Sequence, residues 1–192
     1  MRPPAGIRSG HAINLTVGFS NTTSSTLRRA RLRSPRSRRV QSMNDWKTRD
    51  RILQLCERLY WAIEAFPIAD IPFPLQTEFS GFPNGCCGDT CYLLEQWLTE
   101  NGESGFKRFC GTGTREHPHQ THAWLERGGL IVDITRGQYS RSDEVYVGED
   151  RTLLDVFVEI EPQAGTLRDL GEDDPLVWFY QSLRGRIPRI AD

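Results

Sequence analysis

The stretch FPNGCCGDTC, residues 82–91, decides how this chain is expected to fold. Proline and glycine interrupt regular structure in its first half, and apolar residues then recur at helical spacing as far as the Asn-Gly pair at 101–102. The pattern predicts a helix that begins at Gly88 or Asp89 and ends at that pair. Its predicted buried face consists of Cys91, Leu94, Trp97 and Leu98. Cys87 is therefore expected directly before the helix, where free backbone N–H groups lower a thiol pKa and can bind an oxyanion.

A second helix is expected before this stretch, over residues 44–66. Its apolar residues follow steps of four and three, which makes one buried stripe on the helix. The stripe consists of Ile52, Cys56, Leu59, Ile63 and Phe66. Pro67 ends this helix, and Pro72 and Pro74 make the segment as far as about Gly81 an irregular loop.

The pattern changes to strands after Gly102. The expected strands cover residues 105–111, 121–127, 130–135, 144–147 and 154–161. The Gly-Gly pair at 128–129 predicts a two-residue hairpin turn between the second and third of them. A final helix is expected from Asp173 or Asp174, with a proline in its first turn, to about 184–185. Helices first and an antiparallel sheet afterwards indicate an α+β fold.

Residues 1–43 differ in composition from the rest of the chain. They hold nine of the 24 basic residues and none of the 25 acidic ones, so the remainder carries a net charge of about −10. Because they show no apolar periodicity, we expect them to be disordered. Three interpretations stay open: residues 28–39 bind nucleic acid, residues 1–43 form an organelle transit peptide, or the native product begins at Met43 and does not include the segment before it. We favour the interpretation that the native product begins at Met43. The acidic remainder, residues 44–192, argues against nucleic-acid binding by the folded domain.

The five cysteines form an odd set at irregular spacing, with no secretory signal. This usage indicates reduced thiols in the cytoplasm and not a disulfide framework. Because no run of about 18 apolar residues occurs, we expect no membrane partner. Cys56, Cys91 and Cys110 fall on apolar faces and are expected in the core, where free cysteine packs as a small apolar residue. Cys87 is the candidate nucleophile, and its neighbour Cys86 is the weaker candidate.

His122 and Asp133 lie on the two strands of the predicted hairpin. A two-residue turn at 128–129 places residue 125 opposite residue 132. With this register, the side chains of His122 and Asp133 lie on the same face of the hairpin, diagonal to each other. A carboxylate on an otherwise apolar strand needs a partner, and an imidazole supplies one. We expect one ring nitrogen of His122 within hydrogen-bond reach of Asp133 and the other about 3.5 to 4 Å from the sulfur of Cys87. The alternative is that His122 is a surface residue and Asp133 an edge residue, and that neither has a catalytic role.

Three short motifs in this order resemble those of the transglutaminase-like, papain-related cysteine peptidase superfamily. They are Gly-Cys-Cys at 85–87, His-Ala-Trp-Leu-Glu at 122–126 and Asp-Ile-Thr at 133–135. The resemblance covers roughly residues 82–135 and points to an uncharacterised bacterial subgroup, distantly similar to lasso-peptide leader peptidases. It implies an N-terminal helical part, with the nucleophile at a helix N-terminus, packed on an antiparallel sheet.

The same resemblance implies a cysteine hydrolase or acyltransferase that acts on peptide or amide bonds through a thioester and needs no cofactor. Cys87 is then the nucleophile, His122 the base and Asp133 the group that orients it. Residues 44–192 form the catalytic domain, and a peptide or protein is its substrate. Candidates for binding the oxyanion or the substrate are Asn84, Gly88, Gln138 and Trp124. The chain departs from papain-like peptidases in having no glutamine a few residues before the nucleophile, so Gln76 and Gln120 are more distant alternatives for an oxyanion donor.

Two other functions use the same residues. A zinc site would take thiolates and imidazoles from Cys86, Cys87, Cys91, His117, His119 and His122. The usual Cys-x₂-Cys spacing is missing, however, so we expect no bound metal. The second alternative is a catalytically inactive protein-interaction domain on the same scaffold.

Overall fold

The computed structural model of the chain describes residues 35–139 and 145–187, with side chains from Trp46 onward. Most of the tail expected to be disordered, residues 1–34, lies outside this range. Residues 35–43 are helical, contrary to expectation, because the first helix begins at Pro35 and not near residue 44. Proline is favourable in the first turn of a helix, and no glycine follows it before Trp46 to interrupt the helix.

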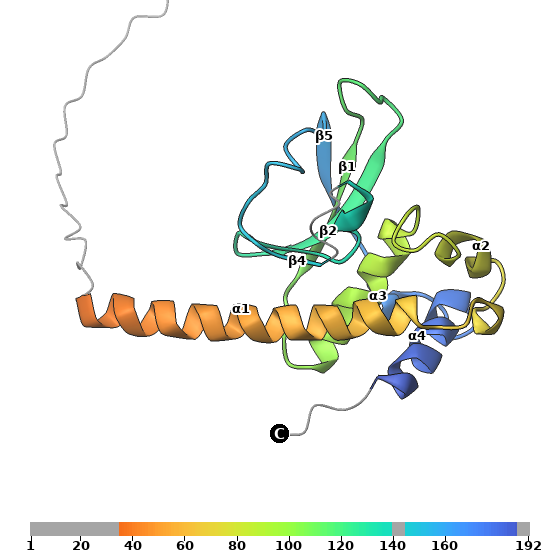
Figure 1. The fold of residues 1–192 in the computed structure, drawn as a ribbon, viewed down its shortest axis with the longest axis horizontal. Helices are drawn as coiled ribbons and strands as arrows, with labels where there is room; N and C mark the ends of the chain where they lie inside the picture. The colour runs from red at the N-terminus through yellow and green to blue at the C-terminus, as the bar shows by residue number, and fades with distance from the viewer. Residues whose placement is uncertain (1–34, 140–144, 188–192) are drawn as a thin grey trace, which may run out of the picture. The chain divides into compact units, whose positions relative to one another are not determined.

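The fold is a mixed α+β arrangement of helices and one antiparallel sheet (Figure 1). The helices are α1 Pro35–Glu64, α2 Leu75–Phe79, α3 Cys87–Glu100 and α4 Pro175–Arg186, and the 3₁₀ turns are η1 Ile68–Asp70, η2 Arg136–Gln138 and η3 Leu167–Asp169. The strands are β1 Lys107–Thr112, β2 Thr121–Arg127, β3 Leu130–Asp133, β4 Tyr146–Gly148 and β5 Glu159–Gln163. The strands of the sheet follow the order β4-β3-β2-β1-β5.

The helices confirm most of the sequence-based boundaries. α3 ends at Glu100 with Asn101 as its C-cap and Gly102 in the left-handed region, at φ 84°, as the Asn-Gly pair predicts. Its four predicted buried residues are all buried. The segment before it is less irregular than expected, because the short helix α2 and the turn η1 lie within the predicted loop.

The β2–β3 hairpin has the predicted register. Leu125 lies opposite Val132, and both turn glycines have positive φ. Such a turn requires φ values that side chains with a Cβ rarely adopt, so glycine is favoured at both positions. The strand β2 has its predicted bounds, whereas β3 ends two residues earlier than expected.

The outer strands differ more from expectation. β1 is shifted by a residue or two, and β4 begins at Tyr146, whereas its expected start at residue 144 lies outside the described residues. The last strand was expected over 154–161 but β5 covers Glu159–Gln163. Its apolar signal came from Leu154 and Phe157, which pack against the face of the sheet without pairing with a strand.

The sheet separates two apolar clusters, because successive residues of a strand point to opposite faces. On one face, Leu125 and Val132 join the main core with the buried residues of α1, α3 and α4. On the other face lies a smaller cluster of Trp124, Ile131, Leu154 and Phe157. Gly111 of β1 makes room for this second cluster, since a Cβ there would lie 2.5 Å from Cγ of Phe157.

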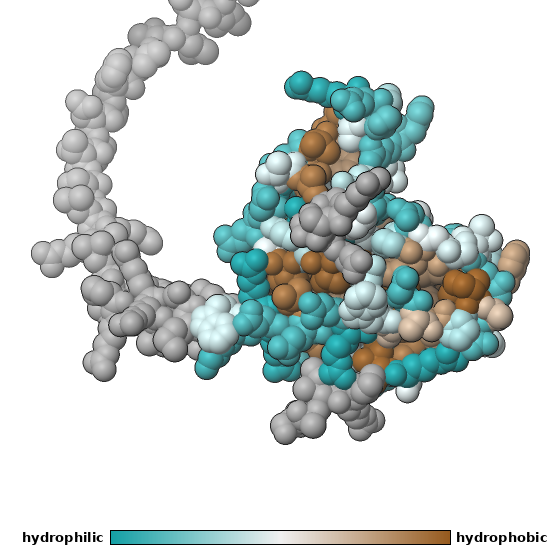
Figure 2. Space-filling model, viewed as in Figure 1, coloured by the Kyte–Doolittle hydropathy of each residue, from teal (hydrophilic) through white to brown (hydrophobic). Residues whose placement is uncertain are grey.

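On the face that Figure 2 shows, apolar areas are separated from one another by polar residues. No helix within residues 35–139 and 145–187 combines the length and the apolar character that crossing a bilayer would require.

Candidate functional site

The N-terminus of α3 carries the two adjacent cysteines. Cys86 is the N-cap and Cys87 the first helical residue, so the helix begins one residue earlier than the earlier of the two predicted starts. No side chain caps this end. The first backbone N–H groups of a helix have no intrahelical acceptor, and the positive end of the helix dipole lies beside them. The thiol of Cys87 therefore lies at a site that favours a negative charge.

The two thiols face different surroundings. Cys86 is buried, and its sulfur lies 3.7 Å from the carbonyl oxygen of Pro83 and 3.6 Å from the hydroxyl of Thr90. Burial raises the pKa of the Cys86 thiol to about 11, although the Thr90 hydrogen bond opposes the rise. Cys86 is thus kept protonated and held within its own turn. Cys87, which is only partly buried, is the cysteine that interacts with His122.

The environment of Cys87 favours its thiolate. Burial raises the pKa of the Cys87 thiol, but a hydrogen bond with His122, the charge of that imidazole and the N–H group of Ala123 outweigh burial. The pKa therefore lies below its ordinary value. A lowered pKa increases the share of thiolate, which is the nucleophilic form of cysteine.

His122 and Asp133 form the predicted hydrogen bond. The distance from Nε2 of His122 to Oδ2 of Asp133 is 2.7 Å, and both side chains are 2% exposed. Burial lowers the pKa of His122, but the charge and the hydrogen bond of Asp133 raise it to about 9, and Cys87 acts in the same direction. The buried carboxylate thus stabilises a protonated imidazole beside the thiol.

Asp133 is itself fixed by the chain that follows it. Its second oxygen, Oδ1, accepts hydrogen bonds from the backbone N–H of Thr135 at 2.9 Å and from the Thr135 hydroxyl at 3.1 Å. Aspartate is well suited to such local turns because its short side chain reaches the backbone two residues on. The Asp-Ile-Thr motif therefore places beside His122 a carboxylate whose two oxygens both accept hydrogen bonds. The role of Thr135 was missed in the sequence, although the Asp-x-Thr spacing signals it.

The remaining ring nitrogen of His122 has a partner that the sequence did not predict in this role. Nε2 of Gln138 lies 2.9 Å from Nδ1 of His122. Because Asp133 occupies the other nitrogen, Nδ1 is the position at which a proton from Cys87 would arrive. Gln138 therefore contacts His122 and is not an isolated side chain.

Aromatic rings enclose the imidazole. Tyr139 meets His122 edge-on with ring centroids 4.8 Å apart, and Trp124 and Phe157 lie 6.0 and 6.3 Å away in stacked orientations. The indole of Trp124 is wholly buried, and its N–H donates to Glu126 at 2.7 Å. Trp124, expected as an oxyanion or substrate contact, therefore supports the imidazole within the second cluster.

The other oxyanion candidates hydrogen-bond to groups other than Cys87 and His122, or offer only their backbone. Asn84 is exposed, and its amide donates to the carbonyl of Gly81 at 3.2 Å within one turn. Gln76 donates to the carbonyl of Ile71, and Gln120 interacts with the hydroxyl of Tyr139. Gly88 lies in the first turn of α3, with open space where a side chain would be. Of these candidates, the backbone at Gly88 has the position closest to Cys87 along the chain.

The residues considered for zinc are not gathered at one point. His117 and His119 lie in the exposed loop between β1 and β2, beside a shallow hollow of about 380 Å³. Within residues 46–139 and 145–187, no three His, Cys, Asp or Glu side chains are arranged to hold a metal ion. Cys56 and Cys91 are buried in the main core, as expected, whereas Cys110 is only partly buried.

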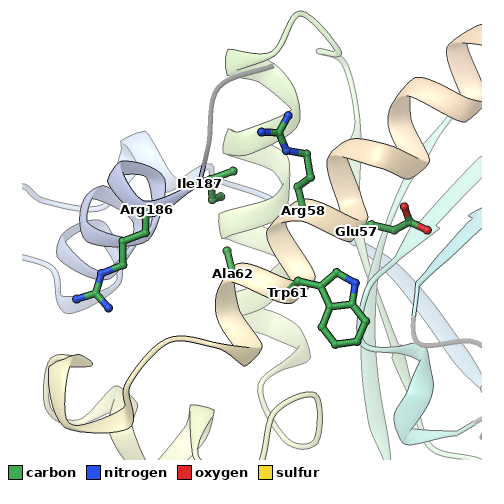
Figure 3. Close-up of a pocket in the computed structure, with 6 residues that line it drawn as sticks. All are labelled: Glu57, Arg58, Trp61, Ala62, Arg186 and Ile187. Carbon is green, nitrogen blue, oxygen red and sulfur yellow. The ribbon is translucent and has the colours of Figure 1, made fainter. Parts of the chain in front are cut away.

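A larger hollow lies away from this site. It measures about 460 Å³ and is formed by α1 and the end of α4 (Figure 3). Its lining residues are Glu57, Arg58, Trp61, Ala62, Arg186 and Ile187. None of them belongs to the cluster of Cys87, His122 and Asp133, so the hollow adds nothing to that chemistry.

The residues brought together are thus Cys87, His122, Asp133, Thr135 and Gln138. Comparisons of the chain with protein-family models, with curated proteins and with solved structures yield no match.

Proposed function

We propose that this protein is a cysteine-nucleophile hydrolase or acyltransferase acting on peptide or amide bonds through a thioester. Cys87 is the nucleophile, His122 the base and acid, and Asp133 the residue that orients His122. The observation that carries the proposal is the hydrogen bond of 2.7 Å between Asp133 and a buried His122 whose ring also lowers the pKa of the Cys87 thiol. A thiol, a base and an orienting carboxylate are the parts that this kind of catalysis needs.

The reaction starts from the ion pair that the two pKa shifts favour, in which the thiol proton of Cys87 has already moved to Nδ1 of His122. The thiolate then attacks the carbonyl carbon of the substrate, and the carbonyl oxygen takes up the negative charge. In this proposal, backbone N–H groups at the start of α3 stabilise that oxyanion. The carbon–nitrogen bond breaks as His122 returns its proton to the leaving amine, and a thioester remains on Cys87.

The second half of the reaction releases the acyl group. Water, or an amine in the case of acyl transfer, gives a proton to His122 and attacks the thioester. The carbon–sulfur bond then breaks and the thiolate of Cys87 is restored. The three side chains supply every proton transfer, so the proposed reaction requires no cofactor.

The proposal includes membership of the transglutaminase-like, papain-related superfamily. What supports it is the placement of Cys87 at a helix N-terminus and of His122 and Asp133 on adjacent antiparallel strands. The three motifs occur in the order that this superfamily uses. A peptide or protein substrate is part of the same proposal.

An activated ester tests the proposal without knowledge of the natural substrate. Incubation with p-nitrophenyl acetate should release p-nitrophenol and leave an acetyl group on Cys87, which mass spectrometry of a digest locates. We expect Cys87→Ala to abolish acetylation at this site and His122→Ala to slow it by about 10²-fold or more, because the base is lost. Cys86→Ala is the matched control and should keep most of the rate.

Two results would contradict the proposed function. One is equal release of p-nitrophenol by the wild type and by Cys87→Ala. The other is acetylation of Cys87 no faster than that of a cysteine in an unstructured peptide, which is the outcome expected of an inactive interaction domain.

A further inference from the structure

Gln138 contacts the ring nitrogen of His122 at which the proposed proton transfer takes place. Its amide nitrogen lies 2.9 Å from Nδ1, and Asp133 occupies Nε2 at 2.7 Å. Both ring nitrogens therefore have protein partners. The proton leaving Cys87 must arrive at a nitrogen that Gln138 already touches.

The backbone holds Gln138 firmly in this place. It is the last residue of η2, and its N–H donates to the carbonyl of Thr135 at 3.2 Å. Tyr139, the next residue, donates its hydroxyl to the carbonyl of Thr121 at 2.9 Å. At the other end of η2, the guanidinium of Arg136 is buried and lies 3.7 Å above the ring of Tyr146. The turn is thus attached to β2 and β4, and the side chain of Gln138 is directed at His122.

An amide matches both protonation states of an imidazole. A neutral ring that gives its Nε2–H to Asp133 has a lone pair on Nδ1, which accepts from the NH₂ group of Gln138. A protonated ring carries a hydrogen on Nδ1, and the amide oxygen accepts it after a half-turn of the amide. Nε2 of Gln138 is the amide atom that lies 2.9 Å from Nδ1, and a half-turn of the amide brings its oxygen to the same place.

We infer that Gln138 is a positioning residue that holds Nδ1 of His122 in both protonation states, so that Cys87 and His122 exchange a proton without rotation of the ring. In this exchange the S–H bond of Cys87 breaks and an N–H bond forms at Nδ1, which leaves a thiolate and an imidazolium. The amide of Gln138 turns as that hydrogen arrives. This inference rests on the proposed function, because it concerns the same pair of residues.

The inference predicts opposite effects of two substitutions on His122. Hydrogen bonds to a charged group are about twice as strong as those between neutral groups, so loss of the amide costs the imidazolium more than the neutral ring. Gln138→Met, of similar size but without hydrogen bonding, should therefore lower the pKa of His122. Gln138→Glu places a second carboxylate on the ring and should raise it by about one unit or more.

Few other titratable groups lie where they could shift the pKa of His122. Among the described residues, the titratable groups that face the ring are Cys87 from α3, Asp133 from β3 and Tyr139 after η2. The neighbouring strand β1 presents Gly111 opposite His122, and the segment before β5 presents Phe157, neither of which titrates.

Nuclear magnetic resonance of the full chain with ¹⁵N-labelled histidine measures the protonation of the His122 ring nitrogens as a function of pH. We expect the titration midpoint of His122 to fall in Gln138→Met and to rise in Gln138→Glu, with folding checked by circular dichroism. Gln54, exposed on α1, supplies the matched controls Gln54→Met and Gln54→Glu, which should leave the midpoint unchanged.

The outcomes separate this inference from the proposed function. An unchanged His122 midpoint in both Gln138 variants would overturn the positioning role, whatever the reactivity of Cys87. Shifted midpoints in a protein whose Cys87 is not acetylated would keep the contact between Gln138 and His122 but remove the reaction that it serves, which also defeats the inference.

Discussion

Asp133 shows how much of the site depends on single hydrogen bonds. One carboxylate oxygen accepts from His122 and the other from two groups of Thr135. A buried carboxylate without such partners would be costly, because desolvation disfavours its charge. The raised pKa of His122 therefore depends indirectly on Thr135.

Replacement of Thr135 by valine tests this dependence at nearly constant volume. The change removes the hydroxyl that donates to Asp133 at 3.1 Å and leaves the backbone donor in place. We expect a loss of about 1 to 2 kcal/mol in the free energy of unfolding, measured by urea denaturation, because one bond to a buried charge is lost. We also expect a lower pKa of His122, since the Asp133 carboxylate becomes less well held.

The chain contains a matched control for this change. Asp150 and Thr152 form the same local motif, with hydrogen bonds of 3.0 and 2.6 Å, at an exposed position. Thr152→Val should cost much less, because water replaces the lost donor there. Equal losses in the two variants would show that burial of Asp133 does not strengthen its bonds.

Some residues of the site could be predicted from the sequence and others could not. Cys87, His122 and Asp133 could be singled out because each lies at a helix start or on a hairpin whose register follows from its turn. The contact of Gln138 with His122 could not be predicted, since the 3₁₀ turn that aims its side chain is fixed by long-range contacts of Tyr139 and Arg136.

At the scale of elements, β1 supports the site through a residue without a side chain. Gly111 pairs with His122 across the sheet, and the ring of Phe157 lies over it. Phe157 in turn stacks beside His122. A glycine in a strand often marks a close approach of this kind.

Gly111→Ala should disturb both the strand and the site. The added Cβ would lie 2.5 Å from Cγ of Phe157, so the ring must move. We expect a loss of about 1 to 3 kcal/mol in stability, as for other overpacked positions, measured by thermal or urea unfolding. Phe157→Ala lowers stability by itself because a buried ring is lost, but in that background the further change Gly111→Ala should cost less than it does in the wild type.

A glycine elsewhere provides the comparison. Gly185 lies within α4 and has open space around the position of a Cβ. Gly185→Ala should raise stability by up to about 1 kcal/mol, because alanine has the higher helix propensity. A stable Gly111→Ala protein with unchanged reactivity of Cys87 would refute the link from β1 through Phe157 to His122.

Prediction of elements succeeded where a local signal fixed the geometry. The glycine pair between β2 and β3 sets the turn and hence the register, and the Asn-Gly pair ends α3. The strand predicted from residue 154 was wrong in its first part, because Leu154 and Phe157 have the apolar pattern of a strand but pack on a face of the sheet. Local pattern does not distinguish these two kinds of burial.

At the scale of the molecule, the candidate site joins the two cores on either side of the sheet. Cys87 packs at the border of the main core, whereas His122 stacks with Trp124 and Phe157 of the second cluster. The thiol and the imidazole are thus held by different parts of the fold. Their contact depends on the packing of α3 against β2.

This placement gives each of the two groups a contribution to stability whose pH dependence has a definite sign. The folded pKa of His122, about 9, exceeds the ordinary value of 6.5, so its protonation stabilises the fold fully below pH 6.5 and progressively less toward pH 9. The lowered pKa of Cys87 acts in the opposite direction, since its thiolate stabilises the fold only above the folded pKa. Reactivity therefore separates the two groups better than stability does.

The rate of alkylation of Cys87 by iodoacetamide as a function of pH tests the central claim, a thiolate held by His122, most directly. A free thiol has a pKa of about 8.5 and reacts slowly near pH 6, where little thiolate exists. We predict that wild-type Cys87 reacts at least about tenfold faster there than in His122→Ala, and that the difference disappears above about pH 9.5 as free thiols ionise. Identical pH profiles in the two proteins, both following that of a free thiol, would contradict the account.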